Sequence, residues 1–242
     1  MADTRAGRRG SYAKGVAKRE EILQTALGVI AREGFRRASV KELADAVGLS
    51  QAGLLHYFDS KEELFTEILR KRDELDVIGH GLGDGRGGNG LGESAGAVAD
   101  ATEGELPDLR AGYVGIIEHN ADVPGLVHLF ARLSVDAADP GHPAHAFFLA
   151  RGEGLRTLFA SAIEAQQRAG QITDRVDAQT LARIFQAVAD GMQLQWMLEP
   201  EVDMAATVGA LFDALAVAPA DTDEAAPAAG TAPATTDTEE RA

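Results

Sequence analysis

Apolar residues recur every three to four positions along most of this chain, which is the spacing of one face of an α-helix. The first run lies between residues 17 and 33, and Gly34 follows it where a helix C-cap is expected. Its apolar positions are Ile22, Leu23, Ala26, Leu27 and Ile30. The pattern predicts a first helix over residues 17–33.

Three helix starts follow within about twenty residues. Ser39 and Glu42 have the spacing of a capping box, and the helix they open is predicted to end at Gly48. Ser50 is a candidate N-cap for a helix over residues 51–57, and Ser60 with Glu63 forms a second capping box. We therefore expect three short helices with sharp boundaries.

Helical periodicity returns in the second half of the chain. The segments are residues 105–119, 123–137, 142–169, 177–199 and 203–217, with breaks at Pro124, Pro140, Gly170 and Pro200. No segment alternates with a period of two residues. The sequence thus predicts an all-α fold with an N-terminal three-helix domain and a C-terminal helical bundle.

Three segments have little to bury. Residues 79–96 contain nine glycines, residues 219–242 are rich in Ala, Pro, Thr and acid, and residues 1–16 are basic. We expect these to be a flexible insertion, an acidic disordered tail and a basic disordered arm. The predicted domains are then residues 17–62 and residues 63–218, the second containing the insertion.

Charge is divided unevenly along the chain. Residues 1–72 hold 14 Lys and Arg against 10 Asp and Glu, whereas the remaining 170 residues hold 9 against 28. The net charge of −15 therefore averages a basic end and an acidic body. Such an asymmetry favours a nucleic-acid-binding end attached to another kind of domain.

Composition narrows the possible chemistry. The chain has no Cys, which removes thiol catalysis and Cys-ligated metals, and we expect no cofactor and no metal site. The pairing of His142 and His145 lacks a metal-binding motif, and solvated or capping roles suit both better. No secretory signal or membrane span is apparent, which predicts a cytoplasmic protein without membrane partners.

Two enzyme motifs occur within the glycine-rich stretch. Gly83, Gly85 and Gly88 match a dinucleotide-binding pattern, and Ser94 lies in a G-x-S-x-G pattern. Both motifs need a preceding β-strand, whereas a charged helix and a glycine run precede them here. We therefore predict that the chain is not an enzyme, and a hydrolase using Ser94 is the disfavoured alternative.

Residues 39–58 have the properties of a helix-turn-helix. Gly48 allows a left-handed turn, Leu49 plugs it, and Leu54 and Leu55 return the second helix against the first. Gln51, Gly53, His56 and Tyr57 then fall on the outward side, where short and hydrogen-bonding side chains suit a DNA major groove. A helical hairpin within another bundle is the alternative.

These residues also resemble the DNA-binding domain of the TetR family of bacterial transcriptional regulators. The resemblance runs from about residue 17 to residue 69, through EEILQTALGVIAREGF, SVKELADAVGLSQAGLLHYF and DSKEELF. The chain has Leu55 where the family most often has Tyr. The segment from about residue 123 to residue 200 loosely resembles the C-terminal domain of the BetI-like branch.

The resemblance implies roles for particular positions. Ser39 and Lys61 would hold phosphates, Gln51 and Gly53 would face base edges, and His56 and Tyr57 would lie at the groove wall. The full set of expected DNA-binding residues is Ser39, Lys41, Ser50, Gln51, Gly53, His56, Tyr57 and Lys61. The basic arm, with Arg5, Arg8, Arg9, Lys14, Lys18 and Arg19, is a further candidate for DNA contact.

The C-terminal bundle is where the resemblance places a small-molecule effector. Polar or aromatic groups within apolar helices are the candidate ligand-binding residues: Tyr113, His128, Arg132, Phe148, Gln186, Asp190, Gln193 and Trp196. For each of them singly, a core or solvated position is the simpler interpretation.

The last two predicted helices carry broad apolar stripes. We interpret them as a homodimer interface formed by Leu181, Phe185, Val188, Met204, Val208, Leu211, Phe212 and Leu215. The sequence and the resemblance together predict a homodimeric repressor that binds a palindromic operator in double-stranded DNA and is released by an effector. A DNA-binding regulator controlled by a protein partner or by its own abundance is the alternative.

Overall fold

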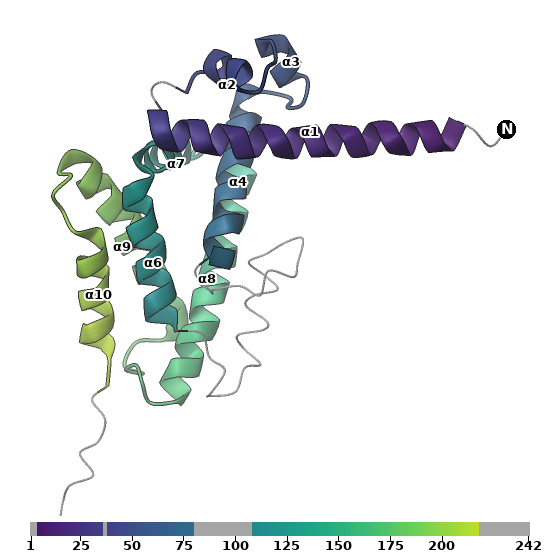
Figure 1. Ribbon diagram of the computed structural model, residues 1–242. Helices are drawn as coiled ribbons and strands as arrows, with labels where there is room; N and C mark the ends of the chain where they lie inside the picture. The colour runs from purple at the N-terminus through teal and green to yellow at the C-terminus, as the bar shows by residue number, and fades with distance from the viewer. Residues whose placement is uncertain (1–3, 36–37, 80–107, 218–242) are drawn as a thin grey trace, which may run out of the picture.

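Figure 1 shows the computed structural model of the chain, which describes residues 4–35, 38–79 and 108–217. The helices in these ranges are α1 (Thr4–Glu33), α2 (Val40–Ala46), α3 (Gln51–Leu55), α4 (Lys61–Gly79), α6 (Leu109–Asp122), α7 (Pro124–Asp136), α8 (His145–Arg168), α9 (Ala178–Leu198) and α10 (Met204–Leu215). The β-pairing within these ranges is an isolated bridge between Ile172 and Ala216. The prediction of an all-α fold is confirmed.

Helix α1 is longer than the sequence pattern suggested. We expected residues 1–16 to be a disordered arm, whereas α1 is continuous from Thr4 and its first half projects beyond the rest of the molecule (Figure 1). Once the packed part of a helix has formed, each further residue adds one hydrogen bond, and no proline interrupts residues 4–33. Most of the expected insertion and the whole expected tail lie outside the described residues, as do Gly83, Gly85, Gly88 and Ser94.

The described helices bury two hydrophobic cores. The first joins α1, α2, α3 and the start of α4 to α7 and the start of α8, and its fully buried side chains include Ile22, Leu43, Leu54, Leu64 and Ile68. The second lies between α6, α8, α9 and α10. Because Leu64, Ile68 and Leu69 of α4 belong to the first core, the expected domain boundary at residue 62 cuts through a packed unit.

A ring of aromatic side chains is at the centre of the second core. Tyr113 makes edge contacts with Phe159, Phe185 and Phe212, at centroid distances of 4.7, 5.7 and 6.0 Å. The Tyr113 hydroxyl donates a 2.7 Å hydrogen bond to the backbone oxygen of Phe185. Because this bond joins a side chain of α6 to the backbone of α9, and because breaking it would leave a buried donor unpaired, it holds the two helices together.

Within the first core, α7 crosses the end of α1. A Cβ atom on Gly125 would lie 2.1 Å from the backbone oxygen of Ile30 and 2.8 Å from the Cα atom of Gly34. Both neighbours are backbone atoms, so they have no rotamer with which to move away. Glycine at residue 125 is therefore what permits α7 to lie against α1.

We predict that Gly125→Ala lowers the free energy of unfolding by roughly 1–3 kcal/mol or more, as overpacking does in a dense interior. Gly15→Ala is the matched control, since a Cβ there meets nothing within 4 Å and alanine favours a helix. Chemical denaturation monitored by circular dichroism measures both. A Gly125→Ala protein as stable as the wild type would show that the α1–α7 contact is looser than described.

Candidate nucleic-acid interface and buried cavity

The helix-turn-helix is set by capping bonds. Ser39 caps α2 in a full capping box: its hydroxyl accepts from the Glu42 amide at 3.3 Å, and the Ser39 amide donates to the Glu42 carboxylate at 2.8 Å. Ser50 caps α3 and accepts from the Gly53 amide at 3.0 Å. The helix starts expected from Ser39 and Ser50 are thus confirmed.

The turn between α2 and α3 has the expected left-handed glycine. Gly48 has a φ of +69°, and the Leu49 amide donates to the Ala44 oxygen at 2.9 Å, which reverses the chain. Leu54 is fully buried and Leu55 is half-buried, so the two side chains expected to return α3 against α2 differ in depth. Helix α3 ends at Leu55, two residues earlier than expected.

The candidate DNA-binding residues share one end of the molecule. Ser39, Lys41, Ser50, Gln51, His56 and Lys61 are exposed, and Gly53 and Tyr57 are half-buried. Tyr57 packs partly against the first core. The Lys61 side chain is 63% exposed, although its ammonium lies 3.3 Å from Glu62. Figure 1 shows α2 and α3 at the top of the molecule, away from α9 and α10.

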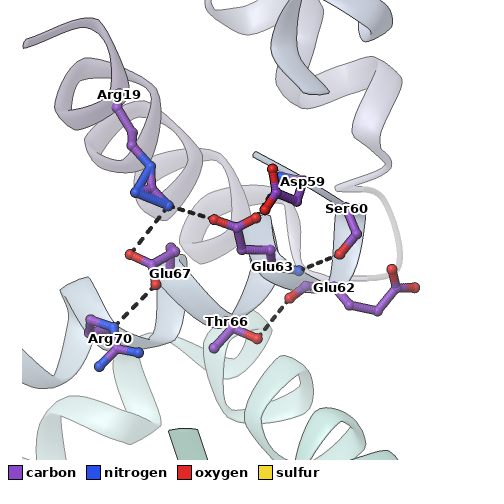
Figure 2. A network of polar contacts seen from close by, with 8 residues as sticks. All are labelled: Arg19, Asp59, Ser60, Glu62, Glu63, Thr66, Glu67 and Arg70. Atoms are coloured by element: carbon purple, nitrogen blue, oxygen red, sulfur yellow. Dashed lines mark hydrogen bonds and ion pairs between the residues drawn. The ribbon is translucent and has the colours of Figure 1, made fainter. Parts of the chain in front are cut away.

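A polar network fixes α4 beneath this surface (Figure 2). The Glu63 amide donates to the Ser60 hydroxyl at 3.0 Å, and the Glu63 carboxylate accepts from the Asp59 amide rather than from Ser60 itself. Arg19 of α1 reaches Glu63 at 2.9 Å and Glu67 at 3.6 Å, and its guanidinium stacks over the Phe58 ring. Arg19 was a candidate for DNA contact, but it joins α1 to α4.

A cavity lies between α4, α6, α8 and α9, where the two cores meet. Its volume is about 70 Å³, which is room for several water molecules or a compact ligand. The apolar part of the wall includes Ile117, Leu155, Phe159 and Ala189. The polar part is contributed by Arg72, Asp73, Asp76, Tyr113, Asn120, Arg151, Arg156, Gln186, Asp190 and Gln193.

Four of the eight candidate ligand-binding residues line this cavity: Tyr113, Gln186, Asp190 and Gln193. The other four lie elsewhere. His128 is exposed with its ring Nδ1 2.9 Å from the Pro124 oxygen, Arg132 is exposed, and Phe148 packs on Phe130 and Phe147. Trp196 borders a broad surface depression between α6 and α10.

Sequence reasoning missed the charged residues of α4 and α8 that line the cavity. Arg72 and Asp76 continue the buried stripe of α4 from Ile68 at four-residue spacing. A charged residue at a position where periodicity expects an apolar one is the signal that was available. Arg151 gave no comparable signal, because no regular apolar stripe runs through residues 149–154 of the sequence.

Ion pairs hold the α4 side of the cavity to α8. Asp73 accepts from Arg151 at 2.6 and 3.3 Å and from Arg72 at 3.1 Å. Burial alone would raise the pKa of Asp73, but the two guanidinium groups more than offset it and lower that pKa. Asp76 lies 3.5 Å from Arg72 and 3.6 Å from His119 of α6. Asp73 is therefore an ionised partner of two guanidinium groups.

Several buried polar atoms of the cavity have no hydrogen-bond partner in the described structure. They are Nε and Nη1 of Arg72, Oδ1 of Asn120 and Oε1 of Gln193. The residues themselves are 4%, 2% and 6% exposed, so water does not satisfy them freely. Burial also raises the pKa of Asp190, an effect that the charges of Arg151 and Arg72 partly reverse.

The structure places the expected dimer residues differently from the sequence interpretation. Leu181, Phe185, Met204, Val208 and Phe212 are buried in the protomer's own second core, and Val188, Leu211 and Leu215 are half-buried against it. The apolar stripes are real, but they pack against α6 and α8 within one chain. Five of the eight side chains are thus inaccessible to a second copy.

His142 and His145 both contact backbone groups near the start of α8. The His142 ring nitrogen accepts from the Ala144 amide at 3.1 Å, and His145 Nδ1 lies 2.8 Å from the Ala137 oxygen. Among the residues placed in the structure, no three His, Cys, Asp or Glu side chains gather as a metal site would require. No helix in the described ranges is both long and apolar enough to span a bilayer.

The helix-turn-helix region is similar in sequence to known bacterial regulators. Residues 22–68 match the family model described as bacterial regulatory proteins, tetR family. The HTH-type transcriptional repressor KstR2 of Rhodococcus jostii (strain RHA1) is 43% identical over 53 residues, which are 22% of this chain and 26% of that protein. The HTH-type transcriptional regulator RutR of Escherichia coli K12 is 38% identical over 55 residues, 23% of this chain and 26% of RutR. The chain thus spans about a quarter of the length of these curated relatives.

Similarity of fold covers much more of the chain than similarity of sequence does. The crystal structure of a TetR transcription regulator from Haloarcula marismortui ATCC 43049 covers 84% of this chain and 100% of its own, with a TM-score of 0.59 and 19% identity. The family match covers the helix-turn-helix with its capping bonds, and the shared fold covers the helical body. Residues 22–68 thus match the model of the tetR family of bacterial regulatory proteins, and the described helices share the fold of a solved TetR regulator.

Proposed function

We propose that the chain is a cytoplasmic transcriptional repressor that binds palindromic operator DNA as a homodimer and is released when a small molecule occupies the cavity. The observation that carries the proposal is the position of α4. Its first half packs beneath the exposed helix-turn-helix, and its second half supplies Arg72, Asp73 and Asp76 to the cavity wall. One rigid element therefore touches both sites.

The exposed end of α2 and α3 suits the binding of DNA. Gln51 and His56 are exposed on or beside α3 and present hydrogen-bonding groups to base edges. Lys41 and Lys61 lie in the first turns of α2 and α4, and both side chains are exposed to approaching phosphates, Lys61 from an exposed ion pair with Glu62. The Ser50 hydroxyl has its own role, since it caps α3.

Occupation of the cavity has a direct path to this surface. A ligand in the cavity lies beside Arg72, Asp73 and Asp76 and changes the position that α4 prefers. Helix α4 carries Glu63 and Glu67, which hold α1 through Arg19. The helix-turn-helix packs on the same part of α1 and α4. Ligand and DNA then favour different positions of one element, which is the requirement for coupling between two sites.

The outer face of α9 is the proposed dimer interface. Ile184, Ala187, Gly191, Leu194 and Leu198 follow the alternating three- and four-residue spacing of a coiled-coil seam. The three large side chains are 39%, 52% and 83% exposed in the protomer. Ala187 and Gly191 in the middle allow close approach of a second helix. This face replaces the buried stripe that sequence periodicity suggested.

We predict that Lys61→Ala weakens binding to all DNA sequences and lowers the salt dependence of binding by about one unit. Gln51→Ala instead changes base preference and costs about 1–3 kcal/mol at a matched site. Mobility shifts on an operator selected from random DNA, and on unselected DNA, separate the two effects. Gln179→Ala, exposed at the start of α9, is the control. If neither variant differs from this control, α3 is not the reading helix.

We also predict that Leu194→Asp converts a dimer into monomers, because burying an unpaired carboxylate in an apolar interface costs several kcal/mol. Leu149→Asp is the matched control, since Leu149 is 62% exposed on α8 and lies outside the seam. Sedimentation equilibrium gives the oligomeric state of each protein. A Leu194→Asp protein that remains a dimer would place the interface on another face.

A further inference from the structure

Three hydrogen-bond acceptors of the cavity lack donors. Two are the buried amide oxygens Asn120 Oδ1 of α6 and Gln193 Oε1 of α9. The third is the carboxylate of Asp190, one helical turn before Gln193, for which no hydrogen bond or ion pair is found among the described residues. An unpaired buried acceptor costs stability, so two of them beside the half-buried carboxylate of Asp190 indicate an absent donor.

The cations of the cavity are held by other groups. Arg151 makes both of its short contacts with Asp73, and Arg72 lies between Asp73 and Asp76. Arg156 donates to the side-chain oxygen of Gln186 at 3.2 Å. Asp190 is therefore left as an acid without a cation in contact with it.

We propose that the cavity binds a small organic ammonium ion, with its nitrogen held by Asp190, Asn120 and Gln193. A primary ammonium group has three N–H donors, one for each of these acceptors. Its positive charge supplies the cation that Asp190 lacks, and its carbon skeleton lies on Ile117, Leu155 and Phe159. This proposal names the ligand class of the effector site and so rests on the proposed function.

A carboxylate ligand fits the same walls less well. Nε and Nη1 of Arg72 have no hydrogen-bond partner, but Asp73 and Asp76 lie 3.1 and 3.5 Å from that guanidinium and already balance its charge. An anion would be repelled by these acids and by Asp190, and it would leave three acceptors unpaired. The balance of free groups therefore favours a cation.

Three probes of nearly equal shape and different charge test this proposal: benzylammonium, benzyl alcohol and benzoate. Isothermal titration calorimetry on the full chain should show benzylammonium binding most tightly, by about ten- to a hundredfold, the value of charge-assisted hydrogen bonds. Asp190→Asn should remove this preference, whereas Asp122→Asn, an exposed acid at the end of α6, should keep it. Preference for benzoate, no binding of any probe, or equal binding of benzylammonium to Asp190→Asn would each overturn the proposal.

A second readout separates a ligand-binding role of Asp190 from a structural one. The other titratable side chains that line the cavity with Asp190 are Arg72, Asp73 and Asp76 from α4, Tyr113 from α6, and Arg151 and Arg156 from α8. Since burial raises the pKa of Asp190, its ionised form opposes folding above the ordinary carboxyl pKa of about 3.9. Asp190→Asn should therefore raise the melting temperature of the unliganded protein at pH 7, and the gain should vanish as the pH falls below 4. A lower melting temperature at pH 7 would mean that Asp190 is a structural partner of Arg151.

The experiments distinguish a failure of the ammonium-site proposal from a failure of the proposed repressor function. Binding of the probes is measured without DNA, and operator binding is measured without probes. A protein that binds operator DNA but prefers benzoate is a repressor with an anionic effector. A protein that binds benzylammonium but no DNA retains the ammonium site and loses the proposed function.

Discussion

The packing of α4 into two environments is the constraint on which the rest of the structure depends. Its first half contributes Leu64, Ile68 and Leu69 to the core beneath the helix-turn-helix. Its second half exchanges apolar for charged residues and faces the cavity with Arg72, Asp73 and Asp76. Because hydrogen bonds within a helix keep its two halves in register, a force on either half is felt by the other.

Burying polar groups in the cavity lowers the stability of the fold, and hydrogen bonds and ion pairs offset this cost only in part. The contacts of Asp73 with Arg151 and Arg72 are short and satisfy the buried carboxylate. Asn120 Oδ1 and Gln193 Oε1 have no hydrogen-bond partner, and the charges of Arg151 and Arg72 offset the burial of Asp190 only in part. Three apolar residues of similar size would pack there at lower cost, since buried ionic groups rarely exceed apolar ones in stability. Unpaired groups of this kind are typical of a binding site.

The sequence was informative wherever structure is local. Capping residues such as Ser39 and Ser50, and the turn glycine Gly48, act on neighbours within five residues, so the helix-turn-helix was predictable nearly residue by residue. Only some of the residues that line the cavity could be predicted from the sequence. Tyr113, Gln186, Asp190 and Gln193 are polar or aromatic positions in apolar helices, but only tertiary packing brings Arg72 and Arg151 to meet them.

The apolar periodicity of α9 led to the wrong face for the dimer interface. A stripe such as Leu181, Phe185 and Met192 shows that one face of α9 is buried, but it does not show what covers that face. Within the protomer, α8 and α6 cover it. The seam that is open to a second copy has fewer large residues, and its small members Ala187 and Gly191 carry little hydrophobic signal.

The coupling of the cavity to a pair of DNA-reading heads is tested most directly by a distance between protomers. The chain has no cysteine, so Asp45→Cys on the exposed side of α2 gives one spin label per protomer. Pulsed electron paramagnetic resonance then measures the label-to-label distance for the free protein, with operator DNA, and with benzylammonium. We expect a narrow distribution on DNA and a different distance when benzylammonium is bound. A distance unchanged by benzylammonium that calorimetry shows to be bound, or no dipolar coupling between labels, would contradict control of paired heads through α4.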